Sequence, residues 1–219
     1  MLIRHIAAVG GFLALTGATA FDLLVLGSSS TETAIAGGAG TDSRIIGAGG
    51  NFQGVYRILW AENSNVPCYF RVYSRHVNQG TTQTEDANLG GASCQETSTS
   101  QRSVGFNSPG LFVNGIAVCR RDQRVKAIRL LYADVGPRGT VTTVKRSDFN
   151  TQPNCSRDNA ATGTLPYGDW GQERLCPAGT IASQIKVYFR PDNPPGLTTA
   201  IKQAATGISL ICRPVEVKD

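Results

Sequence analysis

The side chains that could form a catalytic centre are few, and their spacing does not favour one. A Ser-His-Asp triad would have to use His76, because the other histidine, His5, belongs to an N-terminal segment with the features of a leader. His76 ends a strand-like segment, and the chain contains no G-x-S-x-G motif. We therefore expect His76 to be a solvated residue at a strand end rather than a general base.

Paired carboxylates are the second chemistry to consider, because two acidic side chains can cleave a glycosidic bond. The candidates are Glu85, Asp86, Asp169 and Glu173. Glu85 and Asp86 lie in a polar stretch that is predicted to be a loop, and no sequence pattern brings a pair together. The sequence predicts a protein that is not an enzyme and uses no cofactor, with a secreted glycan-cleaving enzyme as the least favoured alternative.

Six cysteines are the remaining reactive side chains. They are Cys68, Cys94, Cys119, Cys155, Cys176 and Cys212. The closest two, Cys155 and Cys176, are 21 positions apart, whereas zinc sites use close pairs such as C-x-x-C. An even number of widely spaced cysteines indicates up to three disulfides, which can form in about 15 pairings. We expect disulfides and no metal site.

The first 20 residues have the pattern of a secretory signal peptide. Arg4 precedes an apolar stretch at residues 6–15, and the small residues Ala18 and Ala20 follow it. We expect cleavage after Ala20 and secretion of the remaining chain. An uncleaved anchor is the alternative, because residues 21–26 prolong the apolar run. No run of about 18 apolar residues occurs further on, so no transmembrane span is expected in the mature chain.

Composition and local pattern together predict an all-β fold. The chain has 219 residues, a net charge of +5, 17% charged residues and 25 glycines, which excludes a charged coiled coil and a disordered polyampholyte. Short runs of β-branched and aromatic residues alternate with turn residues. Strands are predicted at residues 23–26, 43–46, 54–60, 69–75, 111–119, 125–132, 140–144, 180–189, 200–202 and 207–212. A long polar loop is predicted at residues 78–103.

The chain after the signal peptide divides into two parts. Residues 21–50 are rich in Gly, Ala and Thr and nearly uncharged, which suits either a flexible arm or edge strands. Residues 51–219 are predicted to form the all-β domain. Within it, Asn114-Gly-Ile-Ala-Val-Cys119 and Thr206-Gly-Ile-Ser-Leu-Ile-Cys212 both place Gly-Ile shortly before a cysteine. This similarity indicates diverged internal repeats.

A cluster of basic residues is the first candidate binding surface. Arg120, Arg121 and Arg124, followed by Lys126 and Arg129, lie at a predicted hairpin turn. Such a patch could meet an anionic polysaccharide, phospholipid headgroups or nucleic acid. A solubilising turn is the favoured interpretation, and no nucleic-acid partner is expected because the chain has no recognisable recognition module.

A second candidate surface combines aromatic rings with a carboxylate. Tyr167, Asp169 and Trp170 lie within four consecutive positions. Aromatic side chains offer stacking area, and a neighbouring carboxylate accepts hydrogen bonds from hydroxyl groups. The group therefore suits the binding of a sugar.

An ordered series of short motifs runs through the last third of the chain. It consists of Tyr167-Gly-Asp-Trp170, Cys176-Pro-Ala-Gly179, Gln184-Ile-Lys-Val187, Thr199-Ala200 and Gly207-Ile-Ser-Leu-Ile-Cys212. The series resembles the repeat of vitelline membrane outer layer protein I, most clearly over residues 167–212. The resemblance implies repeats at about residues 94–135 and 167–213 and a disulfide-linked β-prism of three four-stranded sheets. It also implies a structural or carbohydrate-associated extracellular role.

The same resemblance implies roles for the cysteines and for Trp170. It pairs Cys176 with Cys212 and Cys94 with Cys119, and it leaves Cys68 with Cys155. It also makes Trp170 a core residue near Cys176 rather than a sugar-stacking one.

These observations predict a secreted, non-catalytic structural or matrix protein of the coat type. The alternative is a carbohydrate-binding, lectin-like module. The expected partners are an extracellular glycan or neighbouring copies of the same chain. Residues 21–50 are the segment through which a homo-oligomer would form, because an uncharged strand can pair with the open sheet edge of a neighbour.

Overall fold

The computed structural model describes residues 23–63, 66–78, 80–89, 94, 100–121, 123–146, 169–191 and 203–218. These ranges contain strands and no α-helix. The strands are β1 (Leu23–Leu26), β2 (Thr31–Glu32), β3 (Ala36–Gly37), β4 (Asp42–Ile46), β5 (Gln53–Asn63), β6 (Val66–His76), β7 (Thr82–Asn88), β8 (Ser100–Gly105), β9 (Leu111–Arg121), β10 (Arg124–Val135), β11 (Val141–Arg146), β12 (Asp169–Trp170), β13 (Arg174–Leu175), β14 (Thr180–Arg190) and β15 (Ala204–Lys218).

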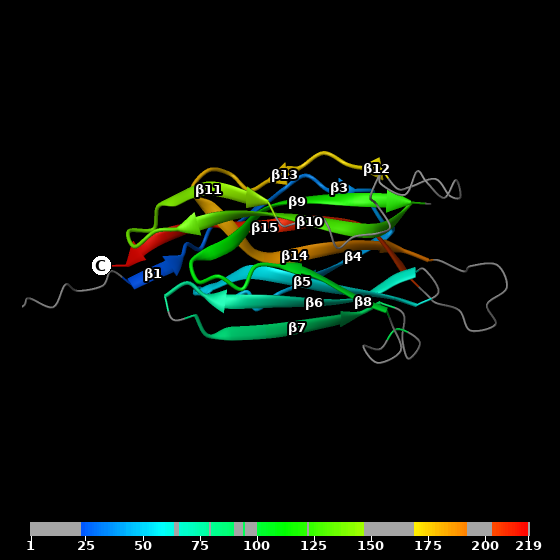
Figure 1. Cartoon of the computed structure of the whole chain (residues 1–219), viewed down its shortest axis with the longest axis horizontal. Coiled ribbons are helices and arrows are strands. Elements are labelled where there is room, and N and C mark those ends of the chain that lie inside the picture. The colour runs from blue at the N-terminus through cyan, green and yellow to red at the C-terminus, as the bar shows by residue number, and fades with distance from the viewer. Residues whose placement is uncertain are drawn as a thin grey trace, which may run out of the picture.

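The strands form three antiparallel sheets (Figure 1). In the first sheet, β1, β2 and β3 follow one another along β15 and make one interrupted row, next to which come β15, β14 and β4. In the second sheet, β12 and β13 make a similar interrupted row beside β9, followed by β10 and β11. The third sheet has the order β7, β6, β5, β8. Each sheet therefore has four rows, which confirms the predicted all-β, prism-like fold.

A hairpin of two long strands forms the centre of each sheet, and the three hairpins share the same irregularities. The first strands are β5, β9 and β14, and the second strands are β6, β10 and β15. Each hairpin is bulged at the fourth residue of its first strand and at the third residue of its second strand. The bulged residues are Tyr56, Asn114, Ser183, Cys68, Lys126 and Thr206. Bulges bend and twist a strand, so matched bulges give the three sheets matched curvature.

The repeating unit of the structure is therefore the bulged hairpin. The two Gly-Ile segments that suggested a repeat do not occupy equivalent strands. Residues 114–119 lie in β9, the first strand of one hairpin, whereas residues 206–212 lie in β15, the second strand of another. The shared Gly-Ile pattern does not mark equivalent positions.

Apolar residues at equivalent positions of the three hairpins form the core. Ile58, Ile116 and Ile185 each occupy the sixth position of a first strand, are fully buried and belong to one cluster. Along β14, buried apolar residues alternate with the half-buried Lys186 and Tyr188. This period of two places one face of the sheet against the other two sheets and the other face toward solvent.

Segments from both ends of the described chain complete the first sheet. β1 pairs with the end of β15, with Leu23 opposite Lys218 and Leu26 opposite Val215, and the C-terminus lies beside β1 in Figure 1. The strands predicted at residues 23–26 and 43–46 are present as β1 and β4.

A buried arginine fixes this closure. Arg213, on β15, is 9% exposed, and its guanidinium donates to the carbonyl oxygens of Gly27 at 2.6 Å and Leu26 at 2.9 Å. It also donates to the side-chain oxygen of Asn51 at 2.9 Å, in the loop that leads to the third sheet. Arg75, at the equivalent position of β6, donates in the same way to the carbonyl oxygen of Ser108, ahead of β9. Both arginines therefore satisfy carbonyl groups that the sheets leave unpaired.

The predicted disulfide between Cys176 and Cys212 is present, with the two Cα atoms 5.7 Å apart. The predicted pairs Cys94–Cys119 and Cys68–Cys155 are wrong, because Cys94 is bonded to Cys68. Cys119 is also disulfide-bonded, and Cys155 lies outside the described residues.

The third sheet explains the bond between Cys68 and Cys94. β7 runs back along β6, and the N–H of Leu89 donates to the carbonyl oxygen of Cys68 at 2.7 Å. The chain that follows β7 therefore starts beside Cys68, and the two Cα atoms of the disulfide are 5.8 Å apart.

The long loop predicted at residues 78–103 is also wrong in part, because it contains β7 and the start of β8. Residues 82–86 of β7 are exposed, and of this strand only Ala87 is buried. An edge strand with so little burial carries no apolar alternation, so its sequence resembles a loop. Asp86 is instead held to Arg71 of β6 by two bonds of 2.6 and 2.7 Å. The strand predicted at residues 200–202 lies outside the described residues.

A polar network on the outer face of the first sheet holds β2 in place. Glu32 accepts hydrogen bonds from the hydroxyl groups of Tyr188 and Ser209, the latter at 2.7 Å, and from Lys186 at 3.1 Å. Partial burial alone would raise the pKa of Glu32, but these three bonds outweigh it and place the pKa below its ordinary value of 4.5.

We predict that Arg213→Met destabilises the protein by roughly 2–4 kcal/mol, because it leaves several buried carbonyl oxygens without a donor. Urea unfolding followed by circular dichroism measures this change. Arg138→Met, at an exposed turn between β10 and β11, is the matched control and should change stability little. Equal stabilities of the two variants would contradict the role of Arg213.

We predict that Glu32→Gln lowers the free energy of unfolding at neutral pH and that this difference shrinks in acid. The lowered pKa means that the carboxylate stabilises the fold fully above the pKa of the unfolded chain. Its contribution is lost as the pH falls through the lower pKa of the folded state. Urea titrations of both proteins between neutral pH and about pH 3 test the trend. A difference that stays constant with pH would contradict it.

Candidate functional site

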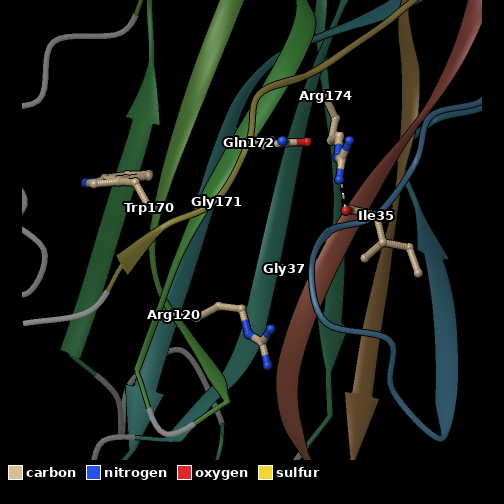
Figure 2. Close-up of a pocket in the computed structure, with 7 residues that line it drawn as sticks. All are labelled: Ile35, Gly37, Arg120, Trp170, Gly171, Gln172 and Arg174. Atoms are coloured by element: carbon tan, nitrogen blue, oxygen red, sulfur yellow. Dashed lines mark hydrogen bonds between the residues drawn. The ribbon is translucent and has the colours of Figure 1, made fainter.

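A pocket of about 350 Å³ lies where the interrupted rows of the first and second sheets face each other. The lining residues are Ile35, Gly37, Arg120, Trp170, Gly171, Gln172 and Arg174. We call it the Arg120–Arg174 pocket. Figure 2 shows the Arg120 and Arg174 side chains extending toward it from opposite ends, whereas the Trp170 ring points away from both.

The first wall of the pocket is glycine backbone. Gly37, in β3, has φ +103°, and its N-terminal neighbours run along β15. A Cβ atom on Gly38 would lie 2.8 Å from Nη2 and 2.9 Å from Cζ of Arg120. The Arg120 guanidinium therefore occupies space that only a residue without a side chain leaves open.

The second wall is the row of β12 and β13, which β9 positions. Trp170 pairs with Cys119 and Arg174 pairs with Ile116, so the link between the two short strands spans the pocket. The Trp170 ring packs against Cys119 and Ala127. This anchoring sets the direction in which Gln172 and Arg174 project.

A cation lies over the Trp170 ring. The guanidinium carbon of Arg129 is 4.6 Å from the ring centroid, and the same guanidinium contacts Glu173 at 3.4 Å. A guanidinium over an aromatic face is an attractive cation–π contact. Since Arg129 occupies this face of the ring, the main role of Trp170 is to hold β12 in place.

Arg120, Gln172 and Arg174 supply the polar groups of the pocket. Nε of Arg174 donates to the carbonyl oxygen of Ile35 at 3.3 Å, which ties the two walls together. Nε of Arg120 is buried and has no hydrogen-bond partner in the part of the chain that the structure describes. No acidic residue is found among the described residues that line the pocket. The pocket is therefore rich in donors and carries positive charge.

The structure brings together only part of the predicted binding residues. Arg120 and Trp170 line the pocket. Arg121 and Arg124 lie opposite each other in the ladder of β9 and β10, next to the turn, and do not line it. Ligand binding by Arg121 and Arg124 stays a prediction. Tyr167 and the side chain of Asp169 lie outside the described residues.

The resemblance-based role of Trp170 needs correction. The ring is half-buried and contacts Cys119 and Ala127 rather than Cys176. The reason is the register of β12, which places Trp170 opposite Cys119 of β9. Cys176 lies beyond β13, where its N–H donates to the backbone carbonyl oxygen of Asn114 at 2.7 Å.

The residues considered for catalysis have structural contacts. His76 ends β6 as predicted, but it is half-buried and stacks on Phe52, with ring centroids 4.8 Å apart. Glu85 accepts a hydrogen bond from the N–H of Gly47 at 2.9 Å, and Glu173 pairs with Arg129.

Sequence reasoning missed Ile35, Gly37, Gln172 and Arg174. Ile35 and Arg174 are 139 positions apart, and their contact depends on how two sheets adjoin. No local spacing encodes such a contact. The one available signal is the Gly37-Gly38 pair, since adjacent glycines often mark a close approach of backbone to another group.

The described residues contain no group of three His, Cys, Asp or Glu side chains that could hold a metal ion. In the same part of the chain, no helix is long and apolar enough to cross a membrane.

Comparisons with known proteins give structural likenesses only. No protein-family model matches the chain, and no curated protein sequence matches it. Similar solved structures include a mannose-specific jacalin-related lectin from Morus nigra in complex with mannose, with 13% identity, a TM-score of 0.45, and coverage of 85% of this chain and 96% of that one. Frutalin from Artocarpus incisa has 12% identity and a TM-score of 0.41, with 85% and 97% coverage. The V. cholerae biofilm matrix protein Bap1 has 11% identity and a TM-score of 0.36, with 89% and 27% coverage.

At these low TM-scores, the fold class rests on the strand topology of the chain itself. The resemblance to vitelline membrane outer layer protein I stays a prediction.

Proposed function

We propose that the chain is a secreted, non-catalytic protein that binds carbohydrate in the Arg120–Arg174 pocket. The observation that carries this proposal is the grouping of Arg120, Gln172 and Arg174 around one pocket between two sheets. Planar guanidinium and amide groups donate hydrogen bonds in fixed directions, and sugar hydroxyl groups accept them. A volume of about 350 Å³ lies at the small end of ligand pockets, which suits a single sugar residue.

The rigidity of the scaffold supports a binding role. The pocket walls are short strands held in register by β9 and β15, and Arg174 bonds across to Ile35. Donors held before the ligand arrives lose little conformational entropy on binding. Such a site favours recognition of a rigid ring with several polar groups.

Two features support secretion. The described chain holds the disulfides Cys68–Cys94 and Cys176–Cys212, and disulfides persist mainly in oxidising compartments outside the cytosol. The signal-peptide pattern of residues 1–20 agrees with this location.

A glycan array tests the proposal. We expect selective binding of a subset of glycans by the mature chain, and weaker binding of the same subset by Gln172→Ala by about tenfold. Gln172 is exposed, so the variant should keep its circular dichroism spectrum and melting temperature. Gln83→Ala, at an exposed position of β7, is the matched control and should bind like the unmodified chain. Absence of binding to any glycan, or equal binding by both variants, would contradict the proposal.

A matrix role by self-association is the second candidate, and the edge strand β4 favours it. β4 pairs with β14 alone among the described strands, and its Ile45 is 48% exposed. An open edge with an exposed apolar residue is a template for strand addition. We expect light scattering to detect concentration-dependent oligomers that Ile45→Lys abolishes. A chain that stays monomeric at high concentration would exclude this role.

A further inference from the structure

We infer that the Arg120–Arg174 pocket selects an acidic saccharide, whose anionic group binds the Arg120 guanidinium. The inference rests on the proposed function and narrows the ligand to sugars that carry a carboxylate or a sulfate ester. These two groups share the same chemistry, because both present two or more oxygens that carry negative charge to a planar pair of N–H donors.

The charge balance of the pocket is the first argument. Arg120 and Arg174 both line it, and no described lining residue is acidic. Two guanidinium groups that line one pocket repel each other, and an anionic ligand relieves this repulsion. The neighbouring basic residue Arg129 has its own partner, since it contacts Glu173 at 3.4 Å. The described lining of the pocket therefore carries the positive charges of Arg120 and Arg174.

The hydrogen bonding of the two arginines is the second argument. Nε of Arg120 is buried, and none of the described residues offers it an acceptor. A buried donor without an acceptor is costly, so a site that leaves one open favours a ligand that supplies the acceptor. Arg174 has its Nε engaged by Ile35 at 3.3 Å, and this bond does not use its two terminal nitrogens. Arg174 is therefore a second donor that is tied to the opposite wall of the pocket.

The glycine wall is the third argument. The Arg120 guanidinium lies against Gly38, where an added Cβ would come within 2.8 Å of Nη2. The guanidinium is the far end of a flexible side chain, so a methyl group at residue 38 would displace it at little cost to the fold. Residue 38 is consequently a glycine because the Arg120 guanidinium occupies the space that a side chain would need, and not because the backbone turns there.

This geometry provides a test that keeps the net charge constant. Gly38→Ala displaces the Arg120 guanidinium but retains its charge, whereas Arg120→Met removes the charge and keeps most of the side-chain volume. Arg138→Met, at an exposed turn, removes one charge elsewhere and is the matched control. Circular dichroism and melting temperature establish that each variant folds.

The probes are tri-galacturonic acid, its fully methyl-esterified neutral form, and a sulfated galactose trisaccharide, each titrated by calorimetry into the mature chain. We expect the unmodified protein and Arg138→Met to bind an acidic probe at least about tenfold more tightly than the neutral ester, as charge-assisted bonds require. Gly38→Ala and Arg120→Met should lose this preference. The relative affinities of the carboxylate and the sulfate probe distinguish the two sources of the anionic group.

The outcomes separate the inference from the function that underlies it. Loss of preference in Arg120→Met and Gly38→Ala, but not in Arg138→Met, supports the inference. Equal binding of acidic and neutral probes by the unmodified protein overturns it and leaves carbohydrate binding intact. A preference that Arg138→Met loses as well also overturns it, because the effect is then one of general charge. If no saccharide binds on a glycan array or in the titrations, the proposed function itself fails.

Discussion

The structure depends on the mutual covering of three apolar sheet faces. A four-row antiparallel sheet with one apolar face cannot stay in water alone, and two stacked sheets of this curvature would leave an open side. Here the three bulged hairpins place Ile58, Ile116 and Ile185 in one cluster at equivalent positions. All three sheets thus contribute residues to one core, which buries an apolar face of each.

The same constraint explains why strands from the N-terminal part of the chain complete the sheet that contains its last two strands. The hairpin of β14 and β15 would have bare edges without β1, β2, β3 and β4, which come from the other end of the chain. Arg213 and the Cys176–Cys212 disulfide both act on this part of the molecule, the first by bonding to Leu26 and Gly27. The closed prism in turn holds the outer strand rows of its sheets rigidly. The Arg120–Arg174 pocket lies between two of these rows.

The pocket arises where the three equivalent hairpins differ. The tenth position of the first strand is Glu62 in β5, Phe189 in β14 and Arg120 in β9. Glu62 forms a buried ion pair with Lys126 at 3.4 Å, and burial lowers the pKa of that lysine. Phe189 joins the apolar core. Arg120 instead lies against the glycine wall of the neighbouring sheet. The same position of the three hairpins is therefore occupied by a member of an ion pair, a core residue and a residue of the candidate binding site.

The residue pattern by itself determined the all-β fold class and most long strands, because burial of one sheet face leaves a local signature of alternating apolar residues. It also singled out Arg120 and Trp170. The Cys176–Cys212 bond was implied by the resemblance to vitelline membrane outer layer protein I and not by this alternation. Only the tertiary structure decided that β7 is a strand, that Cys68 bonds Cys94, and that Ile35 and Arg174 meet. The physical reason is that a polar edge strand has no apolar alternation, and that contacts between sheets depend on long-range register rather than on neighbouring residues.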